Sequence, residues 1–258
     1  MQNGGLITNT RNIPTSISAS GIWSLQDQYD AMINSSWPEV ESYAKVIGTS
    51  APAHGSTSNG QTPSGWTNVW NGNRDDGNTN IPLGFNWTIA STAHNSVYVG
   101  SNNYLTFGIG SNRYNLYSFT QFNSADPAAR ILMTMTSDNS YQYLSYKQFT
   151  GSSGNIEYTR IRFEGNASTS GTVGAGNIVW ECTFFNPVYT FNLPQVEFRC
   201  GVNGRGTGFT MGIGGNNSTG AYASHASLVN QSVVYTATNI SGTAWTHHVG
   251  SKVVITAE

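Results

Sequence analysis

The sequence predicts an all-β protein, an antiparallel β-sandwich preceded by an N-terminal arm and one short helix. Several runs alternate apolar and polar residues with the period of two that strands show, and they are rich in β-branched and aromatic residues. Segments of glycine, asparagine and serine separate these runs, as turns do. With 258 residues, the chain is long enough to bury a substantial core.

The composition excludes several function classes. Only 9% of the residues are charged, against about 25% in typical globular proteins, while aromatic residues reach 12%. The formal net charge is −2 and no run is basic, so we expect no nucleic-acid binding. No apolar run approaches the roughly 20 residues that span a bilayer, so we expect no membrane insertion.

The first 20 residues are polar and aperiodic. They predict either a frayed terminus or an arm that docks on a neighbouring subunit. They contain no apolar segment of the kind that a signal peptide needs. A neutral, extracellular type of composition without such a signal is typical of particles that assemble in the cytoplasm and leave the cell by lysis.

Residues 21–37 predict a helix of about three turns. Ser24 and Asp27 form an S-x-x-D capping box, and Pro38 lies just past the end. So short a helix is marginal alone, so it either packs on its own domain or anchors the chain to a partner. We take 1–38 as arm and anchoring helix. The candidate anchoring residues are Ile22, Trp23, Leu25, Tyr29, Met32 and Ile33.

Residues 39–80 are rich in glycine, serine and asparagine and predict either a linker or a long ordered loop. Trp66 and Trp70 indicate that part of this segment packs against something. Asp75 and Asp76 lack the spacing of a calcium-binding loop and predict a plain turn. Two cysteines are too few for a structural zinc site, so we expect neither a metal nor a cofactor.

Residues 81–107 carry the densest strand–turn–strand signal and begin the sandwich domain, which we assign to 81–258. The residues 100–103, Gly-Ser-Asn-Asn, predict a tight turn, since asparagine tolerates the positive φ that such turns require. The apolar residues of the flanking strands share parity: Phe85 with Trp87, and Val97 with Val99, then Leu105 with Phe107.

Residues 131–137 predict a buried strand and 141–150 a partly exposed aromatic one. If the aromatic side chains of this region are exposed, they would stack on neutral glycans, with amides supplying hydrogen bonds. The alternative is packing in the core or at a trimer interface. The candidate stacking residues are Trp66, Trp70, Tyr141, Tyr143 and Tyr146.

Three strands between 156 and 201 show one apolar and one charged face. The charged set, placed on the outer face of the sheet, is Arg160, Arg162, Glu181, Glu197 and Arg199. For a chain this poor in charge, five such residues on one face predict cross-strand ion pairs.

A hairpin centred on residue 191 would place Phe184 opposite Phe198 and Cys182 opposite Cys200, on the buried side. Such a pair predicts either a disulfide or two buried thiols. A reducing cytosol favours the thiols.

Three stretches resemble known proteins. IPLGFNWTIASTAHNSVYVGSNNYLTFG resembles the core of nidogen-like β domains, with Asn103 where the pattern has glycine. RIRFEGNASTSGTVGAGNIVWECTFF is similar to the second half of such domains in virion proteins of tailed bacteriophages, especially cyanophages. GIWSLQDQYDAMINSSWP resembles a segment near the start of structural and fibre-like proteins of the same phages. The resemblance implies a structural or adhesive role and brings no catalytic residue with it.

We therefore expect a virion structural protein, a tail fibre or tail-associated adhesion protein that forms a homo-oligomer, with a trimer favoured. Its partners would be other virion proteins and a host-surface glycan. A capsid decoration or cement protein, or a baseplate or neck component, are alternatives. A glycan-cleaving enzyme using Glu181 and Glu197 is a remote one, since such enzymes need one carboxyl with a raised pKa and the nearby arginines would keep both ionised.

Overall fold

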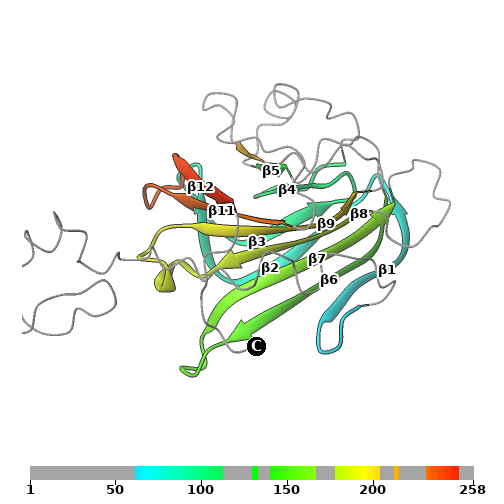
Figure 1. Ribbon diagram of the computed structural model, residues 1–258, viewed down its shortest axis with the longest axis horizontal. Coiled ribbons are helices and arrows are strands. Elements are labelled where there is room, and N and C mark those ends of the chain that lie inside the picture. The colour runs from blue at the N-terminus through cyan, green and yellow to red at the C-terminus, as the bar shows by residue number, and fades with distance from the viewer. Residues whose placement is uncertain are drawn as a thin grey trace, which may run out of the picture. The chain divides into compact units, whose positions relative to one another are not determined.

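Antiparallel strands account for most of the chain that the computed structural model describes, namely residues 62–112, 130–132, 140–166, 178–203, 212–214 and 231–249. They form two sheets, and the prediction of an all-β antiparallel sandwich is confirmed (Figure 1). The predicted arm and the anchoring residues Ile22, Trp23, Leu25, Tyr29, Met32 and Ile33 lie outside the described residues.

The larger sheet has seven strands in the order β1-β6-β7-β8-β9-β11-β12. Four consecutive strands, β6 to β9, pair as a meander in its middle, and β1 pairs with β6 across a long stretch of sequence. The strands are β1 (Thr67–Asp75), β6 (Ser140–Thr150), β7 (Ile156–Asn166), β8 (Ile178–Phe185), β9 (Gln195–Asn203), β11 (Gln231–Ala237) and β12 (Trp245–Val249).

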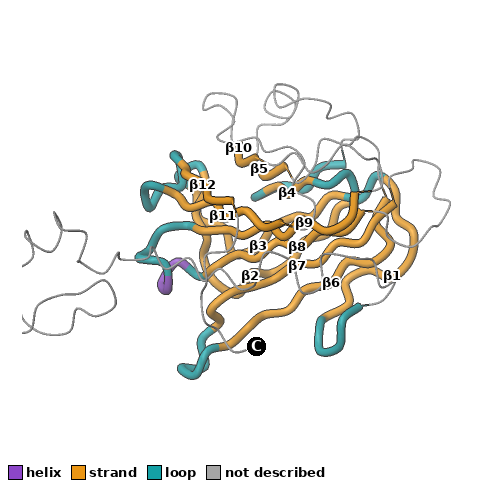
Figure 2. Tube along the Cα trace, in the orientation of Figure 1, coloured by secondary structure: helices purple, strands orange, loops and turns teal. Residues whose placement is uncertain are grey.

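The smaller sheet has five strands in the order β10-β5-β4-β3-β2. They are β2 (Asn78–Ile89), β3 (Thr92–Gly100), β4 (Tyr104–Thr106), β5 (Arg130–Leu132) and β10 (Gly212–Gly214). A single turn of 3₁₀ helix, η1 (Pro187–Tyr189), lies between β8 and β9 and is drawn in purple in Figure 2.

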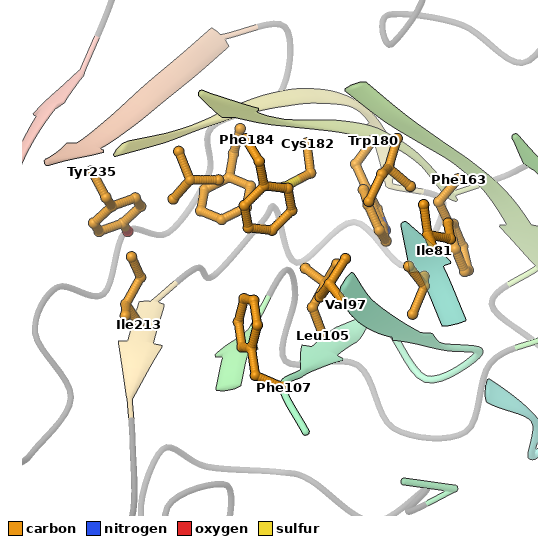
Figure 3. Close-up of a cluster of buried hydrophobic side chains, with 14 of the residues drawn as sticks. Ile81, Val97, Leu105, Phe107, Phe163, Trp180, Cys182, Phe184, Ile213 and Tyr235 are labelled. Atoms are coloured by element: carbon orange, nitrogen blue, oxygen red, sulfur yellow. The ribbon is translucent and has the colours of Figure 1, made fainter. Parts of the chain in front are cut away.

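The core lies between the two sheets and is mainly aromatic. Figure 3 shows Phe107 and Val97 of the smaller sheet pointing toward Phe184 and Trp180 of the larger one. Trp87 stacks on Phe107 at 5.3 Å and meets Phe184 edge-on at 5.1 Å. Its indole N–H donates to the Gln195 carbonyl at 3.2 Å, so the buried polar atom that the ring carries is satisfied across the sheets.

The turn predicted at residues 100–103 is present, and Asn103 has φ of 63°. Its side-chain oxygen accepts the Trp180 indole N–H at 3.1 Å, which ties this turn of the smaller sheet to β8 of the larger one. Asparagine suits this position for two reasons: it tolerates the left-handed backbone conformation, and its side chain supplies a buried hydrogen-bond acceptor.

The sandwich begins earlier than predicted. Residues 67–80, assigned to a linker or long loop, form β1 and the start of β2. The pairing of β1 with β6 is interrupted twice, between Asn68 and Trp70 and between Asn71 and Arg74. These bulges break the period of two by which a strand is recognised in sequence, which is why the segment resembled a loop.

Candidate functional site

The five candidate stacking residues do not form an exposed platform. Tyr141 is completely buried, so this part of the prediction is wrong, and the other four are partly buried. Trp70 meets Tyr141 edge-on at 6.3 Å, and the Arg74 guanidinium lies 4.9 Å from the centre of the Trp70 ring. Trp70 and Tyr146 pack against the core. The alternative of core packing is the better account of these two and of Tyr141.

Trp66 and Tyr143 are the remaining two of the five. The Trp66 backbone N–H donates to the Pro63 carbonyl at 3.1 Å in the turn before β1. Tyr143 pairs in register with Asn71 of β1 and with Glu164 of β7. Neither residue is brought close to the other by these pairings, so the structure does not assemble a stacking surface from them.

The charged residues of β7, β8 and β9 form one chain of ion pairs. Arg162 contacts Glu164 and lies 3.4 Å from Glu181. Arg199 lies 3.8 Å from Glu181 and 3.3 Å from Glu197. The charges alternate along this chain, and the fifth predicted member, Arg160, donates from Nε to the Thr183 hydroxyl at 3.1 Å.

We call these six residues the charged face: Arg160, Arg162, Glu164, Glu181, Glu197 and Arg199. Three arginines and three glutamates balance, so the face carries no net charge when all are ionised.

The charged face is buried, which corrects its assignment to an exposed outer surface. Each of its six side chains is 2% exposed or less. The residues do lie on the side of the sheet opposite the core, as the alternation predicted, but alternation says nothing about whether that side meets water. Two apolar residues that do not belong to the core cluster, Val179 and Val234, are buried as well. Apolar residues between the charged positions were the sign in the sequence that this face is covered.

Burial also changes the acid–base behaviour of Glu197. Desolvation raises its pKa to about 7, and the neighbouring Arg199 and Arg160 only partly oppose this effect. Within the described residues its Oε1 accepts no hydrogen bond, so one oxygen lacks the contacts that would favour the ionised form. The arginines therefore offset the desolvation of Glu197 only in part, and its pKa stays above the ordinary value.

The β8–β9 hairpin is centred one residue earlier than predicted. Cys182 lies opposite Phe198 and Trp180 opposite Cys200, whereas the prediction placed the two cysteines opposite each other. The nine-residue connection 186–194 sets this register. Cys182 is a free, buried thiol, and burial raises its pKa well above the ordinary value, with Glu197 raising it further. The thiol is thus inert by environment.

Four loops lie at one end of the sandwich, and none of them was among the candidate site residues predicted from the sequence. They are residues 90–91, 151–155, 186–194 and 238–244, and we call them the loop end (Figure 2). Their charge-free sequences and the Asn-Pro and Pro residues bounding 186–194 were the available signals, but loops lack the periodicity that marks strands.

Hydrogen bonds join the loops of the loop end to one another. The amides of Ala90 and Ser91 donate to the carbonyls of Gly242 and Ser241, at 3.1 and 2.7 Å, which connects the smaller sheet to the larger. On the other side, the Ser153 and Tyr189 hydroxyls lie 3.2 Å apart. The loops are therefore joined in two pairs, 90–91 with 238–244 and 151–155 with 186–194, and the Ala237 amide at the end of β11 donates to the Pro194 carbonyl at 2.8 Å.

The backbone of the loop end is strained at several positions. Among the described residues, six other than glycine have positive φ, and four of them lie here: Ala90, Ser91, Phe191 and Asn192. Phenylalanine in this region of φ/ψ space is uncommon, at φ of 53°. Backbone strain of this kind persists only where the surroundings fix it and is found disproportionately at functional sites.

Comparison with protein-family models, with curated proteins and with solved structures finds no match to this chain. The described residues contain no group of three or more histidine, cysteine, aspartate or glutamate side chains able to hold a metal ion. In the same residues, no helix has the length and apolar character needed to cross a membrane.

Proposed function

We propose that this protein is a non-catalytic structural protein of a tailed-bacteriophage virion, a tail fibre or tail-associated host-adhesion protein. The observation that carries the proposal is the contrast between a rigid sandwich with its charges paired inside and a set of interlocked, uncharged loops at one end. Such a sandwich can support a binding surface, and its charged side chains are buried where a substrate would not reach them. The sequence resemblance to nidogen-like domains of phage virion proteins supports the same assignment.

The absence of catalysis is part of the proposal. A glycosidase needs two carboxyls that reach the scissile bond, one of them with a raised pKa. Glu197 has the raised pKa, but both it and Glu181 are at most 1% exposed, and Glu181 lies between two arginines. A saccharide has no access to either. Cleavage of a host polysaccharide that is lost on Glu181→Gln would overturn this part of the proposal.

Residues 1–38 would attach the domain to the particle or to sister subunits, with a trimer as the favoured oligomer. Removing them is expected to leave a folded sandwich that no longer enters particles. Chain incorporation is read from the protein content of purified particles, and the circular dichroism of the truncated chain reports whether the sandwich is intact.

The proposal is tested by locating the protein on intact particles. Antibodies against the chain, visualised by electron microscopy on particles purified from the lysate of producing cells, are expected to mark the tail, at tens of copies or fewer. Labelling of the capsid at hundreds of copies would indicate a decoration protein in place of a tail protein. Labelling at the neck or baseplate would indicate a component of that part of the particle. Absence from purified particles would overturn the virion assignment.

A further inference from the structure

The loop end exposes large apolar side chains. Val188 is 73% exposed, Phe191 56% and Ile240 67%. Among the described residues, just one other large apolar side chain is comparably exposed, Ile109 at 59%, and it follows β4 outside the loop end. Three of these four side chains therefore lie on two loops at the same end of the sandwich, the loops that follow the paired strands β8 and β11 on either side of β9.

The same loops carry no aspartate, glutamate, lysine, arginine or histidine. Their polar groups are amides and hydroxyls, which both donate and accept hydrogen bonds. Those at least partly exposed are Ser91, Ser152, Ser153, Asn155, Asn186, Tyr189, Asn192, Thr238, Asn239, Ser241 and Thr243. The surface thus combines an exposed aromatic ring with neutral hydrogen-bonding groups.

The loops are held in a fixed form before any ligand arrives. Asn186 accepts the Val188 backbone N–H at 3.2 Å and donates to the Ile156 carbonyl at 2.7 Å. The Thr190 hydroxyl donates to the Leu193 carbonyl at 2.6 Å, and the Asn239 side chain accepts the Thr243 backbone N–H at 3.2 Å. Because the loops are already ordered, binding there loses less conformational freedom than binding to a flexible loop does.

We propose that the loop end binds a neutral saccharide, with the ring of Phe191 stacked on the apolar C–H face of one sugar unit. The neighbouring amides and hydroxyls would exchange hydrogen bonds with the sugar hydroxyls, which are donors and acceptors in the same way. This inference rests on the proposed adhesion function and names its ligand class. It also moves the predicted glycan contact away from Trp66, β1 and β6 to the loops of the loop end.

The absence of charge selects this ligand over others. A sialic or uronic acid would bring a carboxylate for which the loop end has no basic partner, and a basic or acidic peptide would likewise find no opposite charge. A second copy of the chain would need about 800 Å² of complementary surface per partner, and obligate interfaces of this kind are more apolar than loops rich in exposed amides.

The test is binding of the full chain to an array of oligosaccharides. The array carries neutral oligomers of glucose, galactose, mannose and N-acetylglucosamine beside sialylated and uronate-containing ones. The wild type is expected to bind one or more neutral oligomers. Phe191→Asn should weaken that binding at least about tenfold, or about 1.4 kcal/mol. Asparagine is chosen because it accepts the positive φ of this position, so the variant is expected to fold.

Two further variants make the result specific. Ile240→Ser, on the neighbouring loop, is expected to weaken binding less than Phe191→Asn does, and Ile109→Ser, equally exposed but outside the loop end, should leave it unchanged. Melting temperatures measured by scanning calorimetry are expected to stay close to the wild-type value in Ile240→Ser and Ile109→Ser and to equal or slightly exceed it in Phe191→Asn.

Several outcomes overturn the inference: binding confined to acidic oligomers, binding to none, or wild-type affinity in Phe191→Asn. A homo-oligomer seen by sedimentation that dissociates in Phe191→Asn, with no saccharide bound, would instead make the loop end a contact between copies. If the protein is on particles but the array is blank, the ligand assignment fails alone. If saccharide binding is intact but the protein is absent from particles, the proposed virion function fails alone.

Discussion

The charged face lies on β7, β8 and β9, and two loops of the loop end, 151–155 and 186–194, adjoin these strands, yet the two regions differ in where they place charged and apolar side chains. The charged face gathers three arginines and three glutamates on β7, β8 and β9 and buries all six. The loops that follow and precede these strands expose Val188 and Phe191 and contain no charged residue. In most proteins the distribution is the reverse, with charges outside and apolar residues inside.

The few charged residues of this chain are therefore distributed unevenly, with six buried in the charged face and none in the loop end. Ion pairs inside a protein fix one geometry, because losing either partner leaves a buried charge that is costly to keep. Neutral loops outside leave binding to shape, stacking and amide hydrogen bonds. The two regions can be separated experimentally, because substitutions in the charged face should change stability alone, whereas replacing an exposed apolar side chain of the loop end should change the proposed binding.

The largest effect is expected from Glu181→Gln, which removes the carboxylate between Arg162 and Arg199. Two buried arginines would each lose an ion pair, so the free energy of unfolding should fall by about 3–5 kcal/mol. Urea denaturation at neutral pH measures it. The matched control is Glu157→Gln, at a partly exposed position of β7, and it should change stability by about 1 kcal/mol or less. Equal effects of the two substitutions would show that burial of the ion pairs is not what stabilises the sheet.

The next effect is a dependence of stability on pH that comes from Glu197. Its pKa is about 7 in the folded protein against 4.5 for the unfolded value, so the folded state holds the proton more tightly. The resulting stabilisation is full below about pH 4.5 and is lost as the pH rises to about 7, a change of roughly 3 kcal/mol at most. Denaturation midpoints across this range should fall for the wild type and fall less for Glu197→Gln. Parallel curves for the two proteins would contradict the raised pKa.

A smaller effect is expected in the loop end from Gly242→Ala. Gly242 has φ of 59°, and a Cβ there would lie 2.4 Å from the Thr88 carbonyl oxygen, so the hairpins of the two sheets would be pushed apart. The loss should be roughly 1–3 kcal/mol. Gly65→Ala is the control, since Gly65 has φ of 76° but no atom within 4 Å of the added Cβ. Thermal unfolding that is equally lowered in both would mean that the close approach contributes nothing.

The smallest effect is a gain. Phe191→Asn should raise stability by about 0.5–1 kcal/mol, because asparagine adopts the left-handed backbone at lower cost than phenylalanine. Val188→Asn removes a similarly exposed apolar side chain in η1 without this backbone relief and should raise nothing. A loss of stability in Phe191→Asn, measured by denaturant titration, would show that the ring has a packing role instead.

Much of the fold could be predicted from the period of two. The sides of β7, β8 and β9 were assigned correctly even though the β8–β9 pairing was displaced, because moving the centre of a hairpin by one residue changes each partner by two and leaves the faces unchanged. The pairing of Cys182 with Cys200 failed for the same reason, since pairing depends on register where the face does not.

The remaining errors come from features that leave no periodic trace. The bulges around Gly72 interrupt β1, and the strand was taken for loop. Burial of the charged face depends on what lies over it, which no single strand encodes. The loop end is made of turns that meet only in three dimensions, and Phe191 occupies a backbone conformation that its residue type does not predict.

The pairing of β1 with β6 has a consequence for the order in which the protein folds. Strands β6 to β9 follow one another and pair with their neighbours, whereas β1 must close a loop from Asp75 to Ser140 before it gains its partner. Closing long loops is slow, so we expect the meander to form first and β1 to be added late. Until then the edge of β6 is open to pairing with another molecule, and amide protection there should lag behind that of β8 in pulsed hydrogen-exchange labelling. By pairing with β6, the strand β1 would then close an edge at which the unfinished sheet could aggregate.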